Sequence, residues 1–260
     1  MSDLTLAFEL ANIAQEISLS RFGAADLKVI SKPDLTPVSD ADKSAEEKIR
    51  EYLDEVAPDD GVIGEEFGEK KSQNDRQWIL DPIDGTKNYI RGVPIWANLI
   101  ALRVNGIVTT GVVNAPAIGR RWYASHGKGA FVEEYLLGEK KNRKIQVSKV
   151  EKISDASFAF AEVVKKDNWE GNYERFISLI NEVWRSRGFG DFWAHMLVAE
   201  GAVDFTVEPK LALWDMAALE IIVKEAGGKF SNLSGVAGIG GPGAISSNGI
   251  LHNEIVNRFN

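Results

Sequence analysis

Four short acidic motifs contain the residues of this 260-residue chain that could do chemistry. The central motif, Asp-Pro-Ile-Asp-Gly-Thr at residues 81–86, follows a short apolar run. The others are Ser-Asp-Ala-Asp at 39–42, Gly-Glu-Glu at 64–66 and Trp-Asp at 214–215. If these acids converge in the fold, their mutual repulsion requires bound cations or proton uptake. Their spacing therefore raises the hypothesis of a metal site.

The central motif can present several oxygen ligands at one point. An apolar strand ends at Asp81, which places this carboxylate at the edge where open α/β sheets bind ligands. Pro82 forces the chain to turn, because its φ is restricted and it has no N–H. Asp84 can then point back toward Asp81. The motif therefore offers two carboxylates and the Ile83 carbonyl to one site.

The end of this motif can hold an anion. Gly85 allows the backbone to approach a ligand closely. Thr86 can cap or begin a short helix, and the free N–H groups at the start of a helix attract phosphate. A turn with solvated acids is the alternative, and it is the commoner interpretation of such a motif taken alone.

Asp215 favours the metal site over that alternative. It stands between Trp214 and a very apolar helix, a poor place for an unpaired charge, although a helix N-cap role would also satisfy it. Glu65 likewise follows a glycine after an apolar pair. Ligands that are all oxygens suit Mg²⁺ or Mn²⁺ better than zinc. The histidines show no metal-ligand spacing and are interpreted as structural or surface residues: His126, His195 and His252.

Composition argues against several other kinds of protein. The chain has no cysteine, which excludes disulfides, thiolate metal sites and cysteine nucleophiles and fits a reducing cytoplasm. The net charge is -8, and a solvated loop explains the densest basic stretch, residues 139–144, so nucleic-acid binding is not expected. The N-terminus lacks the features of a signal peptide. No run of about 18 uncharged apolar residues occurs, so no membrane span is expected.

Helices and strands in alternation must position these motifs. Asn105-Gly106 separates two strand-like runs and is a strong hairpin signal. Gly227-Gly228 closes a nearly all-apolar helix. The mixture predicts a layered α/β architecture, with a seam near residues 138–150, where charge density rises. Helices are expected over 3–22, 41–56, 173–184, 192–200, 215–226 and 250–259, and strands over 78–80, 95–104, 106–113, 156–162 and 244–247.

Taken together, the motifs resemble those of the inositol monophosphatase superfamily over nearly the whole chain. The two signatures are Asp-Pro-Ile-Asp-Gly-Thr at 81–86 and Trp-Asp-Met-Ala-Ala at 214–218, supported by the motifs at 39–46 and 64–66. The resemblance implies a five-layered αβαβα sandwich of the α/β (α+β) class, usually dimeric. It also implies one compact catalytic unit of two halves: residues 1–145 carry most metal ligands, and residues 146–260 carry Asp215 and the substrate-selecting residues.

The resemblance further implies a Mg²⁺-dependent phosphatase that acts on a small phosphate monoester. It assigns Glu65, Asp81 and the Ile83 carbonyl to a first Mg²⁺, and Asp81, Asp84 and Asp215 to a second. A third, weaker Mg²⁺ would use Glu65 and waters. Two metal ions can clamp the phosphate and activate water, so no covalent intermediate is needed.

The remaining roles implied by the resemblance concern water and phosphate. Thr86 and Asp42 would orient and deprotonate the attacking water, and the N–H groups of Gly85 and Thr86 would hold the phosphate. Lys32 lies where the family often has a basic residue near the metals. The chain departs from the family at two positions. Ser39 replaces the usual threonine but keeps the hydroxyl, and Lys87 replaces a neutral polar residue and could face the phosphate or solvent.

Within the superfamily, the chain most closely resembles the histidinol-phosphate phosphatase branch, over residues 84–94 and 185–193. The resemblance places Asp191, Glu208 and Asp84 toward the organic part of the substrate. Carboxylates at 191 and 208 suit a cation with an ammonium and an imidazole better than they suit a polyol. Asp191 could instead be a solvated turn residue or pair with Arg187. The tryptophans Trp96 and Trp193 could pack against an imidazole, although core positions are commoner for tryptophan.

Three alternatives remain at this stage. The same scaffold could hydrolyse inositol-1-phosphate, fructose-1,6-bisphosphate or a 3′-phosphonucleotide. The chain could be a non-catalytic regulator that binds RNA or polymerase, although the complete acid set and the acidic balance argue against it. It could also be a structural Ca²⁺-binding module, which would be stabilised by Ca²⁺ without hydrolysis.

Overall fold

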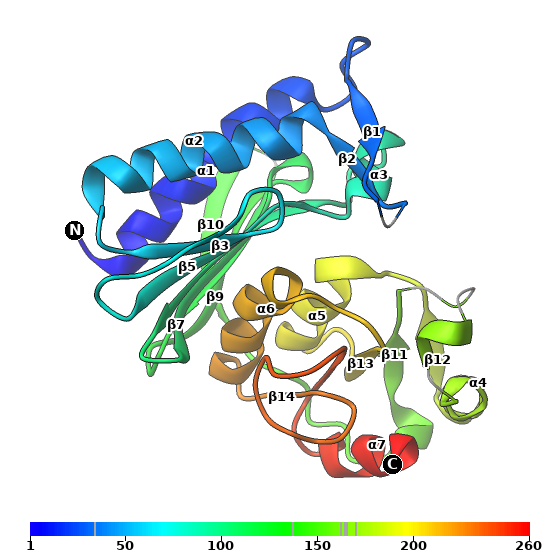
Figure 1. The fold of residues 1–260 in the computed structure, drawn as a ribbon. Helices are drawn as coiled ribbons and strands as arrows, with labels where there is room; N and C mark the ends of the chain where they lie inside the picture. The colour runs from blue at the N-terminus through cyan, green and yellow to red at the C-terminus, as the bar shows by residue number, and fades with distance from the viewer. Residues whose placement is uncertain (34, 137, 162, 164–165, 170) are drawn as a thin grey trace.

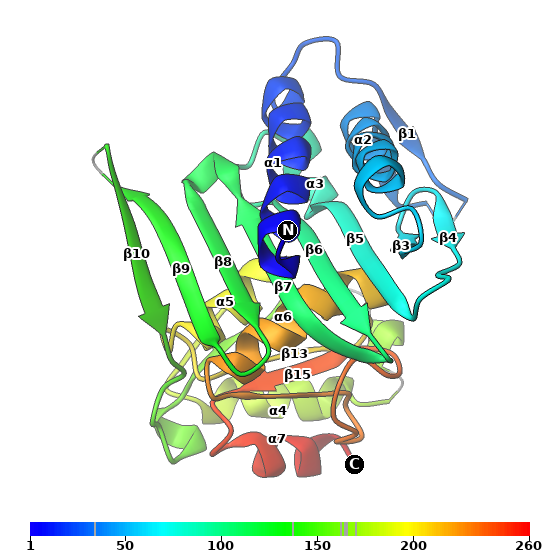
Figure 2. The same ribbon diagram turned by 90° about the vertical axis from the view of Figure 1, so that its left-hand side faces the viewer.

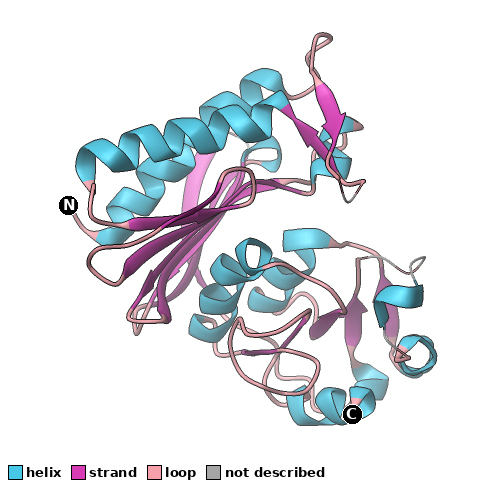
Figure 3. Cartoon of the chain, in the orientation of Figure 1, coloured by secondary structure: helices cyan, strands magenta, loops and turns pink. Residues whose placement is uncertain are grey.

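The chain folds into five alternating layers of helices and sheets (Figure 1). The structure is a computed structural model and describes residues 1–33, 35–136, 138–161, 163, 166–169 and 171–260. The helix pair α1 and α2 forms the first layer, an eight-stranded sheet the second, α5 and α6 the third, a five-stranded sheet the fourth, and α4 and α7 the fifth (Figure 2). Figure 3 shows the same alternation by type of element. The αβαβα sandwich expected from the sequence is therefore confirmed.

The larger sheet has the strand order β10-β9-β8-β7-β6-β5-β3-β4. Its β3 and β5 pair in parallel, and the other neighbours are antiparallel. The strands are β3 (Gly61–Gly64), β4 (Gly68–Lys70), β5 (Arg76–Asp84), β6 (Ala97–Val104), β7 (Ile107–Ala115), β8 (Arg120–Ser125), β9 (Gly129–Leu136) and β10 (Glu139–Ile145).

The smaller sheet has the order β12-β11-β13-β15-β14, and a separate ribbon pairs β1 (Val29–Ser31) with β2 (Pro37–Ser39). The strands of the smaller sheet are β11 (Ser157–Ala159), β12 (Arg185–Arg187), β13 (Phe205–Glu208), β14 (Lys229–Ser231) and β15 (Ala244–Ser247). The helices of the whole fold are α1 (Asp3–Arg21), α2 (Asp40–Val56), α3 (Thr86–Ile90), α4 (Tyr173–Glu182), α5 (Asp191–Ala199), α6 (Leu213–Glu225) and α7 (His252–Phe259).

Apolar side chains from both faces of the larger sheet hold the layers together. On one face, α1 and α2 pack Leu10 and Ile49 against Trp78 in a buried cluster. On the other face, α6 lies so close to β7 that a Cβ on Gly111 would stand 2.4 Å from Ile221 Cγ2. This close packing holds α6 against the larger sheet, where α6 also contacts β5. Among the described residues, no helix combines the length and apolarity needed to span a membrane.

Most expected elements are present, with shifted ends. The hairpin between β6 and β7 has Asn105 at φ 51° and Gly106 at φ 82°, as the dipeptide predicts. The strand expected over 78–80 extends to Asp84, and the strand expected over 156–162 is described only over 157–159. The helix expected from 215 begins two residues earlier, at Leu213.

One interpretation of the sequence is wrong. Residues 139–144 are not a solvated loop but most of β10, which pairs with β9 at the edge of the larger sheet. All six side chains are exposed, so the segment lacks the alternation of apolar and polar residues that identifies a strand. Backbone pairing to β9 forms this strand, and pairing between distant residues leaves no local signal. The neighbouring β8 and β9 also escaped the sequence analysis.

Candidate active site

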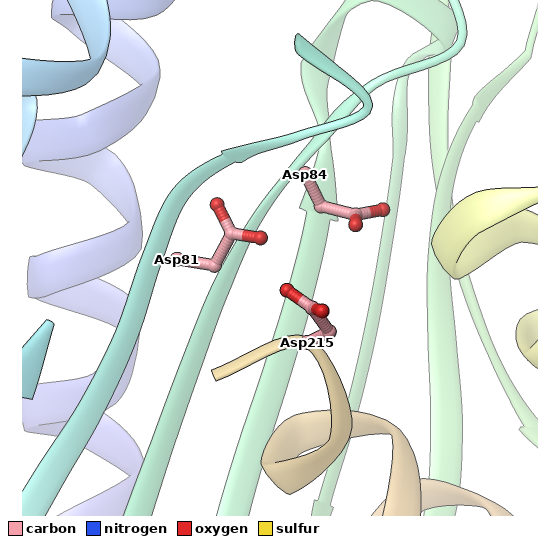
Figure 4. Close-up of side chains that lie close together, drawn as sticks. All are labelled: Asp81, Asp84 and Asp215. Carbon is pink, nitrogen blue, oxygen red and sulfur yellow. The ribbon is translucent and has the colours of Figure 1, made fainter. Parts of the chain in front are cut away.

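Three aspartates from two distant parts of the chain meet between the larger sheet and α6. Asp81 and Asp84 come from β5 and Asp215 from the first turn of α6, and their side chains lie close together (Figure 4). One carboxylate oxygen from each lies within 4.8 Å of the other two. Such a set of oxygens matches the ligands that Mg²⁺ and Mn²⁺ prefer. The structure therefore brings together the acids that the sequence analysis assigned to one metal.

A bulge in β5 turns two acids of the same strand toward one side. The register between β5 and β6 shifts between Asp81 and Asp84, after regular pairing from Arg76 onward. The Ile83 N–H donates to Asp81 Oδ1 at 3.0 Å and stabilises the turn. Asn98 on β6 donates from Nδ2 to the Pro82 carbonyl at 2.7 Å. Asn98 carries no signal in the sequence, because only its place opposite the bulge shows its role.

Asp215 contacts both the helix start and the acid cluster. Its Oδ2 accepts a hydrogen bond from the Ala212 N–H at 2.7 Å, three residues back, at the first turn of α6. The capping alternative from the sequence is therefore correct in part, since the side chain does satisfy a backbone donor at this end. One such bond does not compensate for the like charges nearby, and the carboxylate still lies against Asp81 and Asp84.

Burial and mutual repulsion make this cluster a strong acceptor of positive charge. Burial, followed by the charges of Glu65 and Asp84, raises the pKa of Asp81 well above its usual value. Burial and the charges of Asp191 and Asp215 do the same to the pKa of Asp84. Burial raises the pKa of Asp215 to about 7, although the Ala212 bond opposes the shift. The cluster must bind protons or a cation near neutral pH, and a divalent cation fits it.

The cluster predicts an unusual dependence of stability on pH. The folded state holds these protons to higher pH than the unfolded chain, whose aspartates titrate near pH 4. The free energy of unfolding of the metal-free protein should therefore fall as pH rises from about 4 to about 7. Added Mg²⁺ should raise Tm more at pH 8 than at pH 5, because protons no longer compete with it. Thermal scans across this range, with EDTA or Mg²⁺, check both statements. An Asp215→Asn variant should show a shallower slope, and an unchanged slope would contradict the account.

Glu65 reaches the cluster from the end of β3. Its charge contributes to the raised pKa values of both Asp81 and Asp215, so it lies near both. Lys32, next to the β1–β2 ribbon, places Nζ 2.7 Å from Glu65 Oε1 and 2.6 Å from Glu66 Oε1. The basic residue that the resemblance suggested is therefore close to the acids, where it neutralises part of their charge.

A buried glutamate positions the loop that carries Glu65. Glu46, fully buried on α2, accepts hydrogen bonds from the N–H groups of Glu66 at 2.8 Å and Phe67 at 3.2 Å. Gly64 is required beside it, because a Cβ there would lie 2.0 Å from Glu46 Oε1. The motif at 39–46 contained Glu46, but the sequence alone assigned it no role.

Thr86 and Asp42 are neighbours in the next part of the site. Thr86 Oγ1 lies 3.0 Å from the Ile83 carbonyl oxygen and 3.4 Å from Asp42 Oδ1. The other oxygen of Asp42 accepts from the N–H and hydroxyl of Ser39, which caps α2. Burial raises the pKa of Asp42 to about 6 against these two bonds. A carboxylate with such a pKa, beside a hydroxyl, is suited to accept a proton from water near neutral pH.

Gly85 gives the turn before α3 a conformation that other residues rarely adopt. Its φ is 82°, and a Cβ would lie 3.1 Å from the Ile95 carbonyl oxygen. Asp191, the first residue of α5, accepts from Asn88 Nδ2 at 3.2 Å. The adjacent Phe192 N–H donates to Asp84 Oδ2 at 2.8 Å. The site therefore continues from the three aspartates to the start of α5.

Comparison with known proteins agrees with this geometry. The profile of the Inositol monophosphatase family matches residues 2–258. The chain belongs to the inositol monophosphatase family. It is a phosphoric monoester hydrolase on that scaffold, and the acid cluster at its centre fits a metal-dependent enzyme.

Several known proteins align with this chain over almost its whole length. A histidinol-phosphatase from Mycobacterium tuberculosis (strain ATCC 25618 / H37Rv) is 50% identical over 99% of the chain and 98% of its own length. A histidinol-phosphatase from Chlorobaculum parvum is 40% identical over 98% of this chain and 95% of its own length. The solved Thermotoga maritima IMPase superposes with a TM-score of 0.86 at 30% identity, over 100% of this chain and 97% of its own.

The remaining site residues of this inositol monophosphatase family member differ in their environment. Trp96 is fully buried, with ring centroids 5.0 Å from Tyr89 and 5.4 Å from Phe22, so it is a core residue and cannot pack against a substrate. Trp193 is partly buried and packs against Phe189 at 5.2 Å. Lys87 is exposed on α3.

Glu208 lies on β13 and is buried, with 5% of its surface exposed. Its charge contributes to the raised pKa values of Asp84 and Asp215, and so does that of Asp191. Two further carboxylates therefore stand near the aspartate cluster, one on β13 and one at the start of α5. No local pattern in the sequence predicts this position for either residue; only the family resemblance does.

Proposed function

We propose that the protein hydrolyses L-histidinol phosphate to L-histidinol and phosphate. The observation that carries this proposal is the pair of carboxylates, Asp191 and Glu208, whose charges reach Asp84 and Asp215. A substrate with an ammonium and an imidazole brings positive charge to this part of the site. An uncharged polyol would leave two buried or half-buried carboxylates with weaker compensation. The relatives named histidinol-phosphatase, at 40% and 50% identity, support the same substrate.

The proposed metal is Mg²⁺, with Mn²⁺ as a second choice for the same oxygen ligands. Glu65, Asp81 and the Ile83 carbonyl would hold one ion, and Asp81, Asp84 and Asp215 another. Glu65 with waters would hold a weaker third. Bound there, Mg²⁺ would neutralise charge on the phosphate and lower the pKa of water.

The protein groups supply orientation and proton transfer. The Thr86 hydroxyl would orient the attacking water, and Asp42 would accept its proton as the new P–O bond forms. The N–H groups of Gly85 and Thr86 would hold phosphate oxygens at the start of α3. The bond from phosphorus to the histidinol oxygen then breaks, and that oxygen takes up a proton. Asp191, Glu208 and Asp84 would select the substrate's organic part.

Phosphate release from histidinol phosphate and from myo-inositol-1-phosphate, both with Mg²⁺, tests the proposed function. We expect kcat/KM to be at least about 100-fold higher for histidinol phosphate, which corresponds to roughly 2.7 kcal/mol. Asp191→Asn should reduce this ratio about tenfold by removing one charge that the cation contacts. A ratio near one, or reversed, would leave the metal chemistry intact and assign the enzyme to polyol phosphates. No Mg²⁺-dependent turnover on any ester would instead indicate a non-catalytic role.

Three further properties belong to the same proposal. Residues 1–145 would form the half that carries most metal ligands, and residues 146–260 the half that carries Asp215 and selects the substrate. The enzyme would act as a homodimer in the cytoplasm. Its partner would be the small phosphate monoester alone, without nucleic acid or membrane. The absence of cysteine and the net charge of -8 support the location and the exclusion of nucleic acid.

A further inference from the structure

A fully buried histidine on α5 contacts one of the two substrate-selecting carboxylates. His195 Nε2 lies 3.2 Å from Glu208 Oε1, and its Nδ1 lies 2.6 Å from Ser246 Oγ. Both His195 and Ser246 are 0% exposed. The three residues come from α5, β13 and β15, so this chain of hydrogen bonds crosses from the middle helix layer into the smaller sheet.

The partners determine where the hydrogens lie. An ionised carboxylate can only accept, so Nε2 must carry the hydrogen that points to Glu208. Nδ1 is then free to accept from the Ser246 hydroxyl, which completes the imidazole's hydrogen bonds in its neutral form. A neutral donor orients Glu208 without cancelling its charge. A lysine or arginine in this position would orient it equally well but would neutralise it.

The same helix connects both selecting carboxylates to the aspartate cluster. Asp191 and His195 are four residues apart on α5 and therefore lie on one face of the helix. Between them, the Phe192 N–H donates to Asp84 Oδ2. One rigid element thus carries Asp191, contacts a proposed metal ligand, and holds Glu208 through His195. The distance between the two selecting carboxylates depends on this helix.

We propose that His195 is a positioning residue for substrate specificity. With Ser246 behind it, it holds Glu208 Oε1 in place. The second oxygen, Oε2, makes no hydrogen bond to any residue that the structure describes and is available to a cationic group of the substrate. This inference rests on the proposed function, in which Glu208 recognises the positive charge of the amino alcohol.

Kinetics with two substrates test the positioning role. His195→Leu and Ser246→Ala should raise KM for histidinol phosphate, the former about tenfold, and leave kcat within about threefold. Both constants for p-nitrophenyl phosphate, which has no cation, should change less than about threefold. His195→Gln, which still offers an N–H donor, should recover part of the loss. Equal effects on both substrates would show that His195 only supports the fold and would overturn the inference.

His252 provides a matched control. Like His195, it is a buried histidine, but both of its partners are serines. Its Nδ1 lies 2.8 Å from Ser247 Oγ and its Nε2 lies 3.0 Å from Ser231 Oγ. It lies on α7, in the outermost layer. His252→Leu should lower Tm as His195→Leu does but should leave the ratio of kcat/KM values between the two substrates unchanged. If both variants change this ratio alike, the positioning role is wrong.

A double-mutant cycle separates failure of this inference from failure of the proposed function. If His195 acts through Glu208, His195→Leu should cost little more for histidinol phosphate once Glu208→Gln is present. Fully additive losses would reject the positioning role while the wild-type preference for histidinol phosphate stands. A wild type without that preference would reject the proposed function itself, and the positioning role with it.

Discussion

Asp84→Asn and Asp81→Asn are each expected to lower kcat by at least about 10³-fold, which is the upper end of the loss when one electrostatic group of an active site is removed. Asp81 is proposed to contact both metal ions, and Asp84 also accepts from the Phe192 N–H. Asparagine keeps that acceptor and almost the same shape but lacks the charge that binds Mg²⁺. Phosphate release at saturating Mg²⁺ and substrate measures the loss.

Stability should move in the opposite direction from activity in these variants. Each replacement removes a carboxylate whose pKa is raised by burial and by neighbouring acids, so the repulsion within the folded state decreases. Tm of the metal-free variants should therefore equal or exceed that of the metal-free wild type. Loss of activity together with a large fall in Tm would show that these acids mainly support the fold.

Asp60 is the control for a buried aspartate outside the site. It is 4% exposed and accepts from Trp78 Nε1 at 2.9 Å, with Arg76 Nε 3.3 Å away. Asp60→Asn removes the partner of a cation and should lower Tm while leaving kcat near that of the wild type. Asp60→Asn should therefore lower Tm and keep kcat, whereas Asp81→Asn and Asp84→Asn should lower kcat without lowering Tm.

Removal of the Thr86–Asp42 pair is expected to give the second largest loss, about 10² to 10⁴-fold in kcat, which is the range for general base catalysis. Asp42→Asn cannot accept a proton, but its amide oxygen can still accept from Ser39, so the start of α2 should persist. Thr86→Val keeps the shape of threonine without the hydroxyl. Single-turnover measurements of phosphate release compare the chemical step directly.

The expected pattern across variants identifies the pair as one unit. Thr86→Ser keeps the hydroxyl and should retain most of the activity, whereas Thr86→Val should resemble Asp42→Asn. The double variant should lose little more than either single one, because residues that act together are not additive. Normal turnover by Thr86→Val would rule out the proposed path of the proton.

Local patterns in the sequence predicted much of the fold. The Asn105-Gly106 turn and the glycines after α6 mark ends of elements through short-range chemistry, and both were located correctly. The basic strand β10 was not, because its exposed side chains carry no periodic signal and its pairing partner supplies the order. Ends of helices shifted by about two residues, because the last turns of a helix have weakly defined boundaries.

The sequence by itself determined which chemistry the protein can do. Asp81, Asp84, Glu65 and Asp215 are oxygen ligands in motifs that local rules place at the ends of elements, and the absence of cysteine excludes thiolate chemistry. The bulge that turns Asp84 toward Asp81 also has a local cause, in Pro82 and the turn that follows it.

Only the tertiary structure decided how these residues are supported and which charges they meet. Glu46 beneath the Glu65 loop, Asn98 on the bulge and His195 behind Glu208 act across 16 residues or more of sequence or between different layers. No short-range pattern reveals such contacts. The raised pKa values have the same origin, because burial and the approach of distant like charges exist only after the layers have packed.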